Sequence, residues 1–365
     1  MIQHYQPFLL PFLGKKKHII PPSIRQTYYH SFEDGLWDIL SHRNIPKHAT
    51  IFIPSFYCMD VVKNIKEHGY TPYFYPLDNN FQIKEFFFIT LLKRYRPQVV
   101  ILFHAIGITS QLTKKYHWKR YLSHKSIVIE DSVHRLINPE TIVIHDKNHI
   151  ILNSLRKVSP LGGSMVYEKI SSEDHTSSTR ISFSSYMLKT SIVYFLFRVT
   201  LLLSEHLQSA KMTTIAHEKI LALHDDIIGD SPTGHIGKGL TPRLYPWFNF
   251  SNIESLKTQQ IVRYKSAIQS LFPSRYFFPI KLYLQDYGKL HAYPMGINIK
   301  PSTKLISYLH VNKIFVWEKY KDCPWSKNKG VIFLPLGFHI KTRDIIHISN
   351  ILNTWCTMYS SENIV

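Results

Sequence analysis

Cysteine is scarce in this chain of 365 residues, and its three copies, Cys58, Cys323 and Cys356, lie far apart without any CxxC pair. An odd number of isolated cysteines argues against a disulfide framework or a zinc site and fits a reducing cytosol. The 21 histidines also lack HExxH or other ligand spacing. We therefore expect a cytoplasmic protein with no metal site.

Phosphate-binding glycine motifs are absent as well. Neither GxGxxG nor GxxxxGK[ST] occurs, which argues against a Rossmann dinucleotide site and a P-loop. Acidic residues are few: 25 Asp and Glu face 44 Lys and Arg, giving a formal net charge of +19 that favours anionic partners. No nucleic-acid motif accompanies this charge, so no nucleic-acid partner is expected. A basic module for nucleic acid or membrane remains an alternative that rests on charge alone.

Long hydrophobic runs are missing too. The most apolar stretch, 191–203, is about 13 residues long and contains Arg198. This length and this charge predict a buried helix and no membrane span. Near the N-terminus, the apolar residues 7–13 precede the basic cluster 15–17, which reverses the order of a secretory signal.

Between residues 25 and 165, helix-like and strand-like segments alternate. Apolar spacing predicts helices over 31–41 and 59–68, the second ending at Gly69 as a C-cap. Short apolar runs predict strands at 50–54, 71–75, 98–103, 126–129, 141–144 and 149–152. Such alternation is typical of an α/β fold with a mainly parallel sheet covered on both faces.

The rest of the chain reads differently. Residues 168–250 look mostly helical, with a loop at 229–242, and a helix is expected over 251–271. A smaller α+β unit follows, with the expected strands 278–283, 295–299 and 331–334 and the expected helices 303–310 and 342–355. We therefore predict a large α/β domain over 1–250 and a small C-terminal α+β domain over 251–365.

Two strand ends carry complementary chemistry. The strand that begins at His149 leads into a polar turn with Lys157 and then the pair Gly162-Gly163, and an earlier strand ends at Glu130-Asp131. Ligands of parallel sheets bind at the carboxyl ends of the strands. A lysine amine and an aspartate there are what pyridoxal phosphate needs, as Schiff-base former and as partner of the pyridine nitrogen.

The order of several motifs resembles the DegT/StrS-type sugar aminotransferases, which are fold-type I pyridoxal phosphate enzymes. The resemblance covers most of the chain. Its pieces are 51–58 with the G-x-x-P-x-F-like stretch 69–74, the strand 100–107, Glu130-Asp131-Ser132-Val133-His134, the serine–lysine–GG element 153–163, and a C-terminal signature at Trp317, 333–337 and 342–345.

The resemblance implies a role for each matching residue. Lys157 would be the catalytic Schiff-base lysine and proton shuttle, and Asp131 would pair with the pyridine nitrogen. The other residues expected to bind the cofactor are His134 near the ring, Ser154 at the phosphate with Asn153 beside it, Tyr57 (with Phe56 as rival) stacked on the ring, and Ser31. His104 is expected on the substrate side.

The resemblance also implies an activity. It is transfer of an amino group, with glutamate as donor, to a nucleotide-linked keto-sugar in amino-sugar or surface polysaccharide biosynthesis. Dehydration is the other reaction that the same lysine and aspartate serve in this family. The family's enzymes are homodimers, so a homodimer is expected.

One segment departs from the family. A small glycine-containing element normally opens the first helix and binds the phosphate through backbone amides. Here the matching stretch is 30–35, with Phe32 at the position of close approach and the carboxylates of Glu33 and Asp34 where they would repel a phosphate. The departure motivates an alternative, a catalytically degenerate scaffold or binding protein with the same fold.

Overall fold

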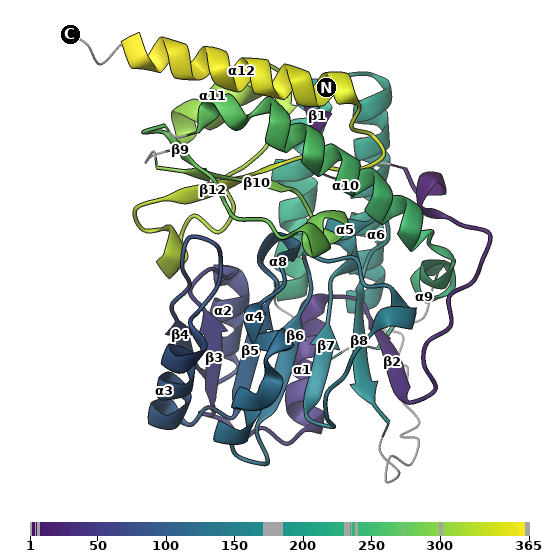
Figure 1. Cartoon of the computed structure of the whole chain (residues 1–365). Coiled ribbons are helices and arrows are strands. Elements are labelled where there is room, and N and C mark those ends of the chain that lie inside the picture. Colours follow the sequence, from purple (N-terminus) through teal and green to yellow (C-terminus); the bar gives the residue numbers. More distant parts are fainter. Residues whose placement is uncertain are drawn as a thin grey trace.

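A seven-stranded sheet forms the body of the molecule (Figure 1). The computed structural model describes residues 2–3, 5, 8–170, 185–229, 234, 236–237, 240–272, 274–298 and 302–361. The strand order is β2-β8-β7-β6-β5-β3-β4, and only β8 runs antiparallel to its neighbours. The strands are β2 (Ile24–Tyr29), β3 (Thr50–Pro54), β4 (Thr71–Tyr75), β5 (Val99–Phe103), β6 (Ile127–Asp131), β7 (His149–Leu152) and β8 (Ser164–Lys169).

Continuous apolar runs explain the central strands. All residues of β5 and β7 are buried, as a parallel strand covered on both faces requires. The mainly parallel sheet is thus confirmed, but the strand predicted at 141–144 is wrong. Pro139 begins a 3-10 turn there, which Asn138 caps, and Val143 is 64% exposed. The apolar run therefore marks a loop, because no neighbouring strand pairs with it.

Helices cover the faces of this sheet (Figure 1). They are α1 (Phe32–His42), α2 (Met59–Glu67), α3 (Glu85–Tyr95) and the single turns α4 (Gln111–Lys114) and α5 (Leu155–Val158). The predicted helices 31–41 and 59–68 are confirmed. Gly69 follows α2 with φ +82°, the left-handed conformation that a helix C-terminus favours and that glycine adopts without cost.

The C-terminal unit stacks on one end of the large sheet (Figure 1). Its three-stranded sheet has the order β12-β10-β9. The elements are α10 (Phe250–Ala267), β9 (Phe277–Phe278), β10 (Tyr293–Ile297), α11 (Thr303–Val311), β11 (Ile314–Phe315), β12 (Gly330–Leu334) and α12 (Thr342–Ser361). β1 (Ile2–Gln3) pairs in parallel with β11, so the first strand of the chain joins this unit. The predicted boundary at 250/251 falls at the start of α10.

Short 3-10 segments complete the connections. They are Leu10–Phe12, Ala105–Gly107, Tyr116–Tyr121, Pro139–Thr141, Tyr245–Trp247, Gln269–Leu271, Leu284–Lys289 and Pro324–Ser326.

In the sequence, a helical segment connects the two units, and the burial of its first helix differs from the prediction. It contains α6 (Ser185–His206), α7 (Ala210–Thr214), a π-helical turn (Ile215–Ile220), α8 (Leu221–Gly229) and α9 (Leu240–Leu244). The buried helix predicted over 191–203 is instead a 22-residue helix, and only 28% of its apolar window is buried. By length and composition alone, α6 is the one described helix that could cross a membrane. It packs on α7 and α8, and its outer side exposes Ile192, Phe195 and Leu196.

Candidate functional site

A cavity of about 620 Å³ opens at the carboxyl ends of the central strands. It brings together side chains from the end of β6, from α5, from the start of α1, from α8, and from a loop of the C-terminal unit. Of the residues predicted for the site, it is lined by Ser31, Tyr57, Asp131, Ser154 and Lys157. His134 lines an adjoining cavity of about 400 Å³, whereas Asn153 and His104 line neither.

Lys157 reaches the cavity because of how α5 is anchored. Leu155 and Val158 are buried in the core below, which turns Arg156 and Lys157 toward the open side. The Lys157 amine lies 5.8 Å from the centroid of the Tyr320 ring. Both adjoining cavities are lined by Lys157, so its amine lies where the two spaces meet.

Gly163 closes the loop after the lysine. It has φ +84°, and a Cβ atom there would lie 2.4 Å from the Tyr28 ring. Its carbonyl accepts from the backbone amide of Leu155 at 2.9 Å, which ties the loop back onto α5. The glycine is therefore required by backbone conformation and by close approach, and it fixes the turn that carries Lys157.

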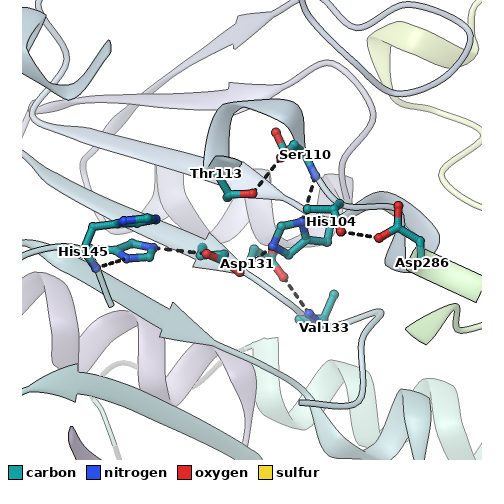
Figure 2. Close-up of polar contacts among 10 residues, drawn as sticks. His104, Ser110, Thr113, Asp131, Val133, His145 and Asp286 are labelled. Atoms are coloured by element: carbon teal, nitrogen blue, oxygen red, sulfur yellow. Dashed lines mark hydrogen bonds and ion pairs between the residues drawn. The ribbon is translucent and has the colours of Figure 1, made fainter. Parts of the chain in front are cut away.

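Asp131 is the last residue of β6 and is 1% exposed. Its Oδ1 accepts from the backbone amide of Val133 at 3.0 Å, a contact visible in Figure 2, and its Oδ2 accepts from the Tyr57 hydroxyl at 2.6 Å. Burial raises the pKa of Asp131 to about 6, against the opposing effects of the Tyr57 hydrogen bond, the Val133 amide and the Lys157 charge. The carboxyl is therefore ionised at neutral pH and titrates just below it.

Tyr57 makes a different contact from the stacking that the resemblance implies. Its hydroxyl is committed to Asp131, and its ring meets Phe103 edge-on, with centroids 5.3 Å apart at 89°. Phe56, its rival, is fully buried against Phe81 and Trp325 and does not line the cavity. Tyr57 thus holds the inner oxygen of Asp131 and forms one wall, and stacking on a ligand ring stays a prediction.

His134 supports the cavity from the adjoining side. Its Nδ1 accepts from the backbone amide of Ile106 at 3.0 Å, which leaves Nε2 as the protonated nitrogen. Nε2 lies 3.2 Å from the Tyr320 hydroxyl, and the ring stacks on His291 with centroids 5.0 Å apart. In this arrangement Tyr320 accepts from His134, and its own proton can be donated into the cavity.

His104 takes part in a buried network instead of facing a substrate (Figure 2). Its Nδ1 accepts from the Ser110 amide at 3.1 Å, and its Nε2 lies 2.6 Å from Glu130 Oε1. His149 Nε2 lies 3.2 Å from the other oxygen of Glu130. Burial alone would raise the pKa of Glu130, but His104 and His149 hold it well below its usual range, and burial lowers that of His104. The network supports β6 next to Asp131, so the structure does not bring His104 to the cavity.

The side chains of the three remaining predicted residues differ in the hydrogen bonds that they make within the protein. Ser154 precedes α5 and lines the cavity, with no side-chain bond to cap that helix. Asn153 is fully buried, and its Oδ1 accepts from the Met165 amide at 2.9 Å, so it ties β7 to β8. Ser31 caps α1: its Oγ accepts from the Asp34 amide at 2.9 Å and donates to Asp34 Oδ2 at 2.8 Å.

Sequence reasoning missed an ion pair at the α1 end of the cavity. Arg156 Nη2 lies 2.6 Å from Asp225 Oδ1, which α8 supplies. Burial alone would raise the pKa of Asp225, but Arg156 holds it at about 2. Beside this pair, burial raises the pKa of Glu33 to about 7, with Arg156 opposing. Arg156 adjoins Lys157 in the sequence and could have been suspected, whereas no local signal marks Asp225.

The residues that line the main cavity can be compared with the chemical groups of pyridoxal phosphate. An amine, a buried carboxylate and the aromatic walls Tyr57 and Tyr320 face one space. Those groups fit a pyridine ring with an aldehyde carbon. At the other end, Ser31, Ser154 and Arg156 supply polar atoms for a phosphate, next to the carboxyl of Glu33. The residues present therefore fit the cofactor. The fit is better at the ring end of the cavity, with Asp131 and Lys157, than at the α1 end, where Glu33 lies beside the expected phosphate.

Comparison by sequence finds no relative: no family model matches the chain, and no curated protein does. Comparison by structure finds many. DesV of S. venezuelae, solved with a ketimine intermediate, superimposes with a TM-score of 0.59 at 10% identity, over 90% of this chain and 84% of that one.

Two further solved structures give the same picture. A DegT DnrJ EryC1 StrS aminotransferase from Brucella abortus has a TM-score of 0.55 at 12% identity, over 91% of this chain and 86% of that one. The sugar aminotransferase CalS13 from Micromonospora echinospora has a TM-score of 0.53 at 13% identity, over 90% and 87%. The chain therefore has the fold of the DegT/StrS-type sugar aminotransferases, as the order of its sequence motifs predicts.

Proposed function

We propose that this chain is a pyridoxal phosphate-dependent aminotransferase that acts on a nucleotide-linked keto-sugar. The observation that carries the proposal is the convergence of Lys157 and Asp131 on one cavity, from the ends of two neighbouring strands. The fold supports it, since the similar structures include sugar aminotransferases.

The proposed roles follow from the geometry. When bound, pyridoxal phosphate supplies an electron sink that allows an amino group to leave one carbon and join another. Lys157 would hold the cofactor through its Nζ, and the same amine would serve as the group that holds and moves a proton. Asp131 would hold the ring nitrogen of the cofactor, where its carboxylate would favour the protonated form. Tyr57 holds this carboxylate in place through the 2.6 Å bond to Oδ2.

The substrates proposed are a keto-sugar carried on a nucleotide and an amino-acid donor, glutamate. The net charge of +19 favours a diphosphate-bearing substrate. The adjoining cavity of about 400 Å³ provides room next to Lys157 for the reacting part of such a molecule. A cytoplasmic homodimer working in surface polysaccharide synthesis is part of the same proposal, and the exposed apolar residues of α6 are available for a subunit contact.

Turnover by the Lys157→Ala variant tests the proposal. We expect at least about a thousandfold loss of glutamate-dependent amination of a keto-sugar nucleotide, because the amine that binds the cofactor and moves the proton is removed. Lys147→Ala changes an exposed lysine between β6 and β7 and serves as the matched control, with wild-type turnover expected. Amination retained by the Lys157→Ala protein would refute the role given to this residue.

A second candidate is favoured by one observation. Glu33 and Asp34 occupy the first turn of α1, and Ser31 already bonds the Asp34 amide that a phosphate would use. The chain would then be a degenerate scaffold that binds a partner and no cofactor. Saturable binding of pyridoxal phosphate, measured by equilibrium dialysis, counts against this candidate, and its absence would establish it over the enzyme.

A further inference from the structure

The cavity that adjoins the main one is lined by charged side chains of both signs. Arg156, Lys157, Lys319 and Lys321 lie there with three histidines, and so do Asp60, Asp225, Glu318 and Asp322. Arg156 is paired with Asp225, and Lys157 is assigned to the cofactor. Lys319, from the loop before Pro324, has no role in the chemistry described above.

Lys319 is a cation without a matching carboxylate. Within the described part of the chain, no Asp or Glu oxygen lies within 4.0 Å of its amine, and Asp225 affects it only at longer range. The nearest aromatic contact is weak, at 6.0 Å from the Trp317 ring centroid. Desolvation and the positive charges of Lys157 and Arg156 lower its pKa to about 8, so it still carries its charge at pH 7. Lys319 is half-buried, so its charge is only partly solvated, and an anion in the cavity would stabilise it.

The backbone holds Lys319 in place. Its amide donates to the Val331 carbonyl at 3.2 Å, and the preceding residue, Glu318, bridges to Ile332 and accepts from the Ser302 hydroxyl. Tyr320, the following residue, has φ +52°, an uncommon conformation for a bulky side chain. Strained residues persist where the surroundings determine them strongly, and such positions cluster at binding sites. The loop therefore presents Lys319 and Tyr320 together beside Lys157.

We propose that Lys319 binds an anionic group of the substrate in the adjoining cavity and so orients the reacting carbon toward Lys157. The inference rests on the proposed function for the identity of the substrate, but the anion site itself depends only on the geometry. Two sources share the required chemistry: the carboxylate of the amino-acid donor and the phosphates of the nucleotide-linked sugar. Lys319 lines the adjoining cavity and not the main one, whereas Glu33 lines the main cavity and not the adjoining one.

Calorimetric titration of the protein without added cofactor tests the site. The probes are succinate, which represents the donor, and inorganic pyrophosphate, which represents the nucleotide, both at pH 7 and constant ionic strength. We expect Lys319→Met to weaken binding of at least one probe by about tenfold or more, since a charge-assisted contact is lost. Lys319→Arg should stay within about threefold of wild type, because it keeps the charge.

Lys327→Met is the matched control, since Lys327 is an exposed lysine of the same loop that lines neither cavity. Its affinities should equal those of wild type. A preference for succinate assigns the donor carboxylate, and a preference for pyrophosphate assigns the nucleotide. Equal affinity of wild type and Lys319→Met for both probes, or no binding of either by wild type, would overturn the inference. Failure of pyridoxal phosphate to bind would refute the proposed function and leave this result intact.

Discussion

The two ends of the main cavity are built on opposite principles. At the ring end, a single buried carboxylate, Asp131, is held by one hydroxyl and one amide and faces an amine. At the α1 end, Glu33 and Asp225 lie near one guanidinium, that of Arg156, and the helix cap is already closed by Ser31. The end with Asp131 therefore suits a cationic ring nitrogen, while at the α1 end a phosphate must compete with negative charge.

The largest effect is expected from breaking the ring end. Asp131→Asn keeps the shape of the side chain and removes its charge, so the ring nitrogen loses its partner. We expect turnover to fall by about a hundredfold or more, with the fold intact by circular dichroism. In the cofactor-free protein the Asp131 carboxyl becomes protonated as the pH drops through about 6, so binding of pyridoxal phosphate should weaken there.

The control for this prediction is Tyr57→Phe, which removes one hydrogen bond from Asp131 and leaves the charge. It should reduce turnover by a smaller factor than Asp131→Asn. Equal turnover of Asp131→Asn and wild type across the pH range would contradict the role of the carboxylate.

An intermediate effect is expected from the network under the ring end. His104→Ala leaves Oε1 of the half-buried Glu130 without its 2.6 Å partner. The free energy of unfolding at pH 7 should fall by about 2–3 kcal/mol, measured by urea denaturation of the cofactor-free protein. Because the pKa of folded Glu130 is depressed, this stabilisation exists above the unfolded value of about 4.3 and is lost as the pH falls below it. His42→Ala, at an exposed position of α1, should change stability little.

The smallest effect is expected at the α1 end of the cavity. Glu33→Gln removes a negative charge next to the expected phosphate position without a change in size. Because the pKa of Glu33 is about 7, the variant should bind pyridoxal phosphate about threefold to tenfold more tightly at pH 8 and as wild type does at pH 6. Glu67→Gln, on the exposed side of α2, provides the control. Unchanged affinity of Glu33→Gln at pH 8 would show that this carboxyl does not oppose the phosphate.

The sequence was sufficient to predict that Lys157 and Asp131 lie at the same edge of the sheet. Lys157 and Asp131 each follow an apolar strand, and parallel strands bring their carboxyl ends to one edge of the sheet. The order of the motifs was likewise sufficient for the fold. The pairing of Arg156 with Asp225 and the position of Lys319 depend on how α8 and the C-terminal unit pack. The spacing of residues in the sequence does not predict this packing.

Two errors have physical causes of the same kind. The apolar run 141–144 resembles a strand, but a strand exists only where a neighbour pairs with it, and Pro139 begins a turn instead. The helix predicted as buried over 191–203 is exposed along Ile192, Phe195 and Leu196. Apolar composition indicates that a helix face is covered by a partner, but it does not show whether the same chain supplies that partner.

The most direct test of the account is chemical trapping of the cofactor. Pyridoxal phosphate is added to the purified protein, borohydride is used to reduce any covalent link, and the modified peptide is mapped by mass spectrometry. The account predicts one equivalent of label per chain on Lys157, and none in Lys157→Ala. Absence of label from the wild-type chain, or label on another lysine, would contradict it and favour the scaffold.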